Sequence, residues 1–160
     1  DVFFANAGTP GSNAGVLEQT VDEWNEVWRV NVVSCMLAVK HAGRRMVEQG
    51  SGSIILTSSA GSLRANAGAI SYSASKAAVH MLTKVMAKAL APEIAVNAIA
   101  PGMIDLGEKA AKPFMRRMAT QTPMRRNGTG EEIAQAAMFF ATAPHFITGQ
   151  ILAVDGGLGL

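Results

Sequence analysis

Hydrophobic and polar positions follow two different periods along this chain, and the changes of period predict its elements. Short runs rich in β-branched and aliphatic residues are followed closely by Gly, Pro or Asn, which is typical of strands that lead into turns. Four such runs occur: residues 1–5, 53–58, 95–100 and 151–154. In the first run residues 2–5 are all apolar, the pattern of a strand buried on both faces in a parallel sheet.

Between these runs, apolar residues recur at helical spacing. Two capping boxes, Thr20-x-x-Glu23 and Thr129-x-x-Glu132, mark helix starts. We expect helices over three segments: from about 21 to 48, 71 to 90 and 130 to 143. The apolar positions of the second of these cover more than one stripe, so we expect that helix to be buried on two sides. Residues 103–127 show a mixed pattern and are expected to be helical in part.

Strands that alternate with helices favour an α/β fold with a parallel sheet and right-handed crossovers. The 160 residues suit a single domain. Charged residues make up only 16% of the chain, which implies large buried faces, either within the domain or against another subunit.

Charge and cysteine content narrow the function classes. The net charge of +2 comes without a basic stripe, which disfavours a nucleic-acid binder. One cysteine, Cys35, allows no disulfide within the chain and fits a reducing compartment. No apolar run reaches membrane-spanning length, and no basic leader opens the chain. We therefore expect a cytoplasmic protein that does not engage a membrane.

Candidate chemistry centres on Tyr72 and Lys76. Their spacing of four residues places both side chains on one face of the predicted helix. A phenol has a reference pKa of about 10, and a neighbouring ammonium favours its ionised form. From spacing alone, a core tyrosine beside a solvated lysine is the more common arrangement, because such pairs occur often on helices. Ser59 adds a hydroxyl at the carboxyl end of the preceding predicted strand, where open α/β sheets bind ligands.

The order of Ser59, Tyr72-x-x-x-Lys76 and an upstream Asn31 resembles the short-chain dehydrogenase/reductase family. The resemblance implies a Rossmann-like doubly wound parallel sheet and an NAD(P)-dependent oxidoreductase that interconverts an alcohol and a ketone by hydride transfer. It implies that Ser59 donates a hydrogen bond to the carbonyl oxygen and that Tyr72 is the general acid or base. Lys76 would also hold the nicotinamide ribose. Asn31 would distort its helix and hold a water of a proton relay, although alone it would also suit a satisfied core amide.

The resemblance also implies a wall that faces the cofactor. Asn6-Ala7-Gly8 resembles the family's Asn-Ala-Gly motif, and Pro101-Gly102 resembles its Pro-Gly motif beside the nicotinamide, although ordinary turns explain both stretches. The implied cofactor-binding residues are Asn6, Ala7, Gly8, Tyr72, Lys76, Pro101, Gly102 and Ile104. No metal site is expected, because the three histidines lack mutual spacing and acidic neighbours.

The sequence departs from the family in one large respect. Family members begin with a Thr-Gly-x-x-x-Gly-x-Gly loop and two strand–helix units that have no counterpart here. We therefore expect residues 1–160 to be the catalytic half of a longer enzyme, with about four strands, and the first strand to be an exposed edge. The choice between NAD and NADP is unreadable without that loop. A non-catalytic scaffold or an inactive fragment that cannot hold the cofactor is the alternative. Leu106 also stands where many members have a threonine.

The expected partners are a small-molecule alcohol or ketone and further copies of the same chain. The segments at 21–48 and 71–90 are too apolar for a free surface, which predicts a homo-oligomer through these helices. By resemblance, residues 103–127 form the flap that selects the substrate, and the methionines of that flap make it apolar and adaptable. The sequence does not identify the substrate.

Overall fold

The computed structural model describes residues 1–64, 68–107 and 112–160. Its centre is a four-stranded sheet in the order β1-β2-β3-β6, in which every neighbouring pair is parallel. The strands are β1 (Val2–Ala5), β2 (Gly52–Thr57), β3 (Ile94–Pro101) and β6 (Ile151–Val154). These bounds match the four predicted runs to within one residue at every end, and the α/β class with a parallel sheet is confirmed.

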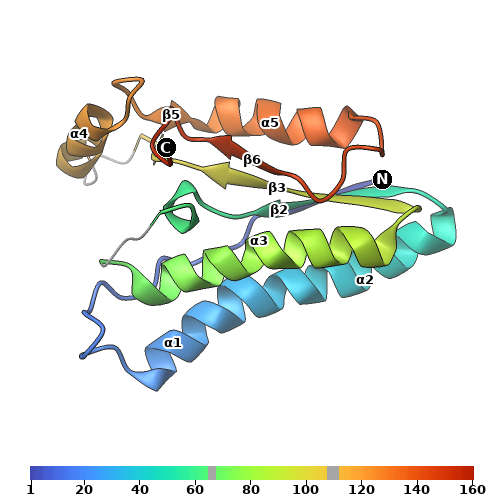
Figure 1. The fold of residues 1–160 in the computed structure, drawn as a ribbon, viewed down its shortest axis with the longest axis horizontal. Helices are drawn as coiled ribbons and strands as arrows, with labels where there is room; N and C mark the ends of the chain where they lie inside the picture. Colours follow the sequence, from blue (N-terminus) through green and yellow to red (C-terminus); the bar gives the residue numbers. More distant parts are fainter. Residues whose placement is uncertain (65–67, 108–111) are drawn as a thin grey trace.

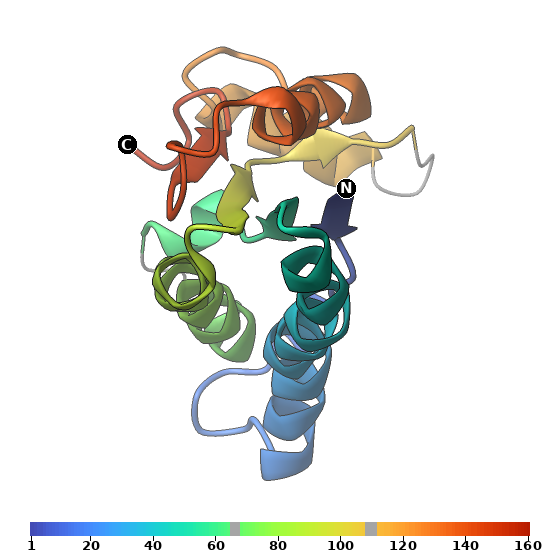
Figure 2. The ribbon, with the colours of Figure 1, turned by 90° about the vertical axis from the view of Figure 1, so that its right-hand side faces the viewer.

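Helices cover both faces of the sheet (Figures 1 and 2). On one face lie α1 (Val21–Trp28), α2 (Ser34–Gln49) and α3 (Ile70–Leu90), and on the other lies α5 (Gly130–Thr142). Both predicted capping boxes are present, because the Thr20 and Thr129 side chains each accept from the third helical N–H while Glu23 and Glu132 bond back. These boxes satisfy backbone groups that a helix start leaves unpaired.

The predicted helix over 21–48 is continuous but not uniform. A π-helix at Arg29–Val33 joins α1 to α2, and Gly50 ends α2 in the left-handed conformation at φ 75°. Asn31 lies at the centre of the π-helix and is fully buried. The helix distortion expected at Asn31 is therefore present as one wider turn.

The central strands bury both of their faces. Ile54 and Leu56 of β2 pack towards α2 and α3, whereas Ile55 between them packs against Phe140 of α5. This alternation follows from the two-residue period of a strand, and it explains why a strand covered on both faces reads as a continuous apolar run.

The exposed edge expected at the first strand is confirmed, whereas the burial expected on two sides of the 71–90 helix is wrong. Val2, Phe3 and Phe4 of β1 are 51%, 38% and 38% exposed, because β1 is the edge of the sheet and pairs only with β2 within the described residues. The helix α3 is buried along one stripe of mostly small residues, whereas Met81 and Val85 are 61% and 54% exposed. A single copy of the chain does not cover both sides of α3.

The segment expected to be a partly helical flap contains α4 (Lys112–Gln121) and a second sheet that the pattern did not indicate. In this sheet β4 (Ile104–Asp105) pairs in parallel with β5 (Gly128–Thr129). Residues 108–111 of the flap lie outside the described residues. None of the helices in the described ranges has the length and hydrophobicity that a membrane crossing requires.

Candidate active site

The carboxyl ends of β1, β2 and β3 meet at the end of the sheet where α3 begins (Figure 1). A cleft of about 250 Å³ opens there. It is lined by Asn6, Gly8, Thr9, Pro10, Thr57, Ser58, Ser59, Tyr72, Lys76, Pro101 and Gly102. The carboxyl ends of parallel strands are the usual ligand-binding edge of an open α/β sheet. The structure therefore brings Ser59, Tyr72 and Lys76 to one opening.

Lys76 is almost fully buried, with 3% of its surface exposed. Its ammonium donates to the carbonyl oxygen of Thr57 at 2.8 Å and lies 5.8 Å from the ring centroid of Tyr72. Burial lowers the pKa of Lys76, and a smaller influence of Cys35 acts in the opposite direction. A buried ammonium that releases its proton more readily than usual is suited to a proton relay.

Ser59 follows β2 in an extended conformation, with φ −160° and ψ 145°, and precedes a 3₁₀ helix at Ala60–Ser62. Its hydroxyl oxygen accepts from the N–H of Gly61 at 3.1 Å. A serine hydroxyl has one proton to donate, and no acceptor for the proton of Ser59 is present in the described part of the chain. That proton is therefore available to a group bound in the cleft.

Asn31 lies behind the cleft and joins three segments. Its carboxamide oxygen accepts from the N–H of Thr9 at 2.8 Å, and its amide donates to the Thr9 carbonyl oxygen at 3.0 Å and to the Ser75 hydroxyl at 2.9 Å. The loop after β1, the π-helix and α3 are thus fixed together through one side chain. Every hydrogen bond of this amide is to a group that borders the cleft or the helix of Tyr72.

Two glycines allow close approach at the walls of the cleft. A Cβ added at Gly8 would lie 3.3 Å from the Lys76 ammonium and 3.4 Å from the carboxamide oxygen of Asn31. A Cβ added at Gly102 would lie 2.7 Å from the Cα of Asp155, closer than real Cβ atoms come. Gly8 therefore lets the loop after β1 pass close to the Lys76 ammonium, and Gly102 lets the turn after β3 pack on the end of β6.

The structure separates some of the implied cofactor residues from the rest. Asn6 lines the cleft and accepts from the Thr57 hydroxyl at 3.0 Å, whereas Ala7 is exposed outside the lining. Ile104 lies in β4 and also does not line the cleft. The sequence reasoning missed Thr57, whose backbone oxygen holds Lys76, and Ser75, which binds Asn31. The signal for Ser75 was available, because a residue three positions after Tyr72 shares its helix face.

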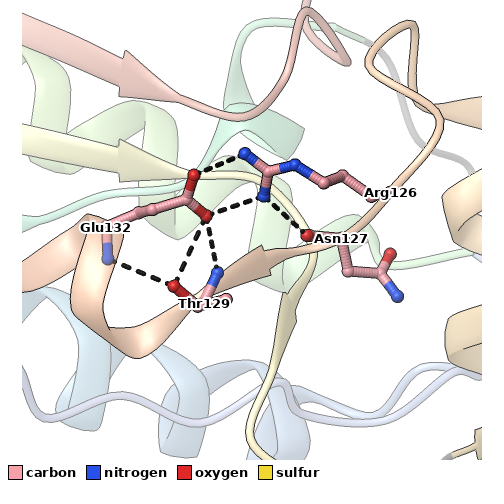
Figure 3. Close-up of polar contacts among 4 residues, drawn as sticks. All are labelled: Arg126, Asn127, Thr129 and Glu132. Atoms are coloured by element: carbon pink, nitrogen blue, oxygen red, sulfur yellow. Dashed lines mark hydrogen bonds and ion pairs between the residues drawn. The ribbon is translucent and has the colours of Figure 1, made fainter.

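A second polar cluster fixes the flap to α5 (Figure 3). The guanidinium of Arg126 forms a two-pronged ion pair with Glu132 at 2.6 and 2.9 Å, and it also donates to the carbonyl oxygen of Asn127. The same carboxylate accepts from the N–H of Thr129. Arg126, followed by Thr129, lowers the pKa of Glu132 to about 2. This cluster borders a separate hollow of about 550 Å³, whose lining includes no residue of the Ser59–Tyr72–Lys76 set.

Comparison with known proteins adds relatives over nearly the full chain. A family model described as enoyl-(acyl carrier protein) reductase matches residues 1–159. A cis-4-hydroxycyclohexanecarboxylate dehydrogenase of Sinomonas cyclohexanicum is 41% identical over 98% of this chain. The structure of ElxO with NADP bound is similar at TM-score 0.92 and 30% identity, covering 99% of this chain and 66% of that one. The structure of an NAD⁺-bound xylitol dehydrogenase is similar at TM-score 0.89 and 30% identity, covering 98% and 68%. The chain spans 65% of the length of the Sinomonas relative.

Proposed function

The chain belongs to the short-chain dehydrogenase/reductase family, and we propose that its residues carry the catalytic groups of an NAD(P)-dependent oxidoreductase that interconverts an alcohol and a ketone. The observation that supports this most directly is the convergence of Ser59, Tyr72 and Lys76 on one cleft at the carboxyl edge of the sheet. Because the chain spans about two thirds of its relatives' length, the activity is proposed for the polypeptide to which these residues belong.

The residues of the cleft fit the nicotinamide end of a dinucleotide. Gly8 leaves one wall without a side chain directly in front of the Lys76 ammonium, and Pro101 and Gly102 form another wall. The ammonium and the Tyr72 hydroxyl are donors of the kind that bind ribose hydroxyls. The bound dinucleotide would supply or accept the hydride. Solved relatives with NADP and with NAD⁺ support either cofactor.

The proposed roles follow from where charge and protons change. A carbonyl oxygen that becomes an alkoxide gains negative charge, and the free proton of Ser59 is available to stabilise it. Tyr72 gives a proton to this oxygen during reduction and takes it back during oxidation. The Lys76 ammonium lies 5.8 Å from the centroid of the Tyr72 ring, so its positive charge stands beside the proton donor in the same cleft.

Asn31 is proposed to support a proton path behind the cleft. Its side chain fixes Ser75 and the loop at Thr9, and its carboxamide oxygen lies on the same side of Gly8 as the Lys76 ammonium. A water held between Asn31 and Lys76 would connect the site to solvent.

The polypeptide is further proposed to act in the cytoplasm as a homo-oligomer. Apolar side chains on the outer faces of the π-helix, α2 and α3 are exposed in one copy: Val33 40%, Met36 42%, Leu37 42%, Met81 61% and Val85 54%. A second copy that packs on these faces would bury them.

The flap around α4 would select the small-molecule substrate. A scaffold without catalysis would not require the three polar groups to meet at a cleft.

The test is an assay of the full-length polypeptide that carries residues 1–160. A panel of ketones and alcohols is offered with each reduced or oxidised dinucleotide, and the nicotinamide absorbance is followed. The variant Tyr72→Phe should lower kcat by about 100-fold or more, because it removes the proton donor, while the Kd of the cofactor rises by no more than about fivefold, the contribution of one hydrogen bond to the ribose. The neighbouring variant Ser73→Ala is the matched control and should turn over normally. An unimpaired Tyr72→Phe enzyme would refute the assignment.

A further inference from the structure

The loop that carries Ser59 is bonded to α3 through a second hydroxyl, that of Ser62. The Ser62 N–H donates to the Ser59 carbonyl oxygen at 3.1 Å, and the Ser62 hydroxyl also donates to this oxygen. The Ser62 hydroxyl oxygen lies 3.1 Å from Nε2 of His80 on α3. It also lies 3.3 Å from the hydroxyl of Ser58, which donates to the Lys76 carbonyl oxygen at 3.0 Å.

Counting protons fixes the direction of the His80 contact. Each hydroxyl has one proton to donate. The hydroxyl of Ser58 donates its proton in a hydrogen bond to the backbone carbonyl oxygen of Lys76. The hydroxyl of Ser62 donates its proton to the backbone carbonyl oxygen of Ser59. Neither hydroxyl has a proton left for the imidazole, so Nε2 of His80 must donate to the Ser62 oxygen. The ring therefore carries its proton on Nε2.

We propose that His80 and Ser62 are positioning residues that hold the hydroxyl of Ser59 at a fixed position relative to the side chains of Tyr72 and Lys76. This inference rests on the proposed function. His80 lies one helical turn after Lys76, so the bond from the loop reaches the same helix that carries the proton donor. His80 bonds to the hydroxyl of Ser62, and Ser62 bonds to the backbone of Ser59. Neither positioning residue needs to contact the substrate for this effect.

The need for such a tie follows from the chain connection. Ser59 lies thirteen positions before Tyr72, in the connection after β2, whereas Tyr72 belongs to α3. Catalytic groups must keep their relative positions to within about 0.5 Å, and misplacement by about 1 Å can cost about 100-fold in rate. A hydrogen bond between the loop and α3 limits their relative movement. Burial, with the charge of Lys84 second, lowers the pKa of His80, which favours the neutral ring.

The first test compares two replacements of His80 in the full-length polypeptide. The variant His80→Leu removes the donor and should lower kcat about tenfold, while the KM of the cofactor changes less than about twofold. The variant His80→Gln places an amide N–H near the position of Nε2 and should keep at least about half of the wild-type kcat. His145→Leu, in the exposed segment after α5, is the matched control and should have no effect. Equal losses in the Leu and Gln variants would overturn the inference.

A double variant separates positioning from general damage to the fold. If His80 acts through Ser59, then His80→Leu should change kcat by less than about twofold when it is added to Ser59→Ala. A further tenfold loss in that background would overturn the positioning role. Nitrogen chemical shifts of His80 give a readout that needs no activity and no variant, and a proton on Nδ1 instead of Nε2 would also overturn it. A wild-type polypeptide without hydride transfer would refute the proposed function itself, whereas an active one with normal His80→Leu turnover would refute only this inference.

Discussion

Replacing Asn31 by alanine tests whether the π-helix, the loop after β1 and α3 are held together by one amide. The side chain of Asn31 is fully buried and makes three hydrogen bonds, at 2.8, 3.0 and 2.9 Å. Alanine removes all three and leaves the N–H and carbonyl groups of Thr9 and the hydroxyl of Ser75 without this partner. Ser75 retains one bond, since its hydroxyl donates to the Tyr72 carbonyl oxygen at 2.7 Å.

The expected loss of stability can be worked out from these contacts. A hydrogen bond contributes about 1 kcal/mol net, and a polar group left unpaired in the interior costs about 1–3 kcal/mol. Thr9 is only half-buried, so water can replace part of what its backbone loses. The total is therefore about 3 kcal/mol. For a domain of about 150–250 residues, this corresponds to a fall in Tm of about 6–12 °C.

Urea unfolding of the full-length polypeptide, followed by circular dichroism, measures this difference directly. Asn25→Ala is the matched control, because Asn25 is an exposed asparagine six residues earlier, in α1, and its loss should change the free energy of unfolding by less than about 0.5 kcal/mol. If Asn31→Ala were as stable as Asn25→Ala, Asn31 would not be the structural tie that its hydrogen bonds indicate.

Two further predictions concern the surface. Glu132 has a folded pKa of about 2 against an ordinary 4.5, so the ion pair with Arg126 and the bond from Thr129 stabilise the fold above about pH 4.5 and lose that effect as the pH falls towards 2. Glu132→Gln should therefore be less stable than wild type in urea at pH 7, with the gap closing by about pH 2; a gap independent of pH would contradict this. Met81→Glu should shift the sedimenting species of the full-length polypeptide to a smaller mass, because it places a charge on the exposed apolar face of α3, whereas the charge reversal Arg116→Glu on the exposed side of α4 should not. Unchanged sedimentation of Met81→Glu would place the interface elsewhere.

Local signals were sufficient for the four strands of the main sheet and for the helices that cover it. The capping boxes at Thr20 and Thr129 depend on two side chains three residues apart, and both form as expected. The central strands were readable because both of their faces are covered within the chain. The strand β1 has the same apolar pattern in sequence, yet its side chains are exposed. It is the edge of the sheet and pairs only with β2 within the described residues.

The candidate site was predictable where its groups are side chains in a fixed pattern. The spacing of Tyr72 and Lys76 determines that they share a helix face, and the end of β2 determines the edge at which Ser59 lies. The acceptor of Lys76 was not predictable, because it is the backbone oxygen of Thr57, and every residue has such an oxygen. The two-residue strands β4 and β5 were also missed, since four residues are too few to show a period.

The geometry of the cleft depends on how many segments are tied to α3. Lys76 binds the end of β2, Ser75 binds the amide of Asn31, and His80 binds the loop after Ser59. These three residues lie within six positions of one helix, and their partners come from three other segments. Tyr72, in contrast, is only partly buried and lies at the open end of the helix. The proton donor therefore stays accessible to a substrate, because its neighbours along the helix, rather than its own side chain, supply the contacts that keep the cleft assembled.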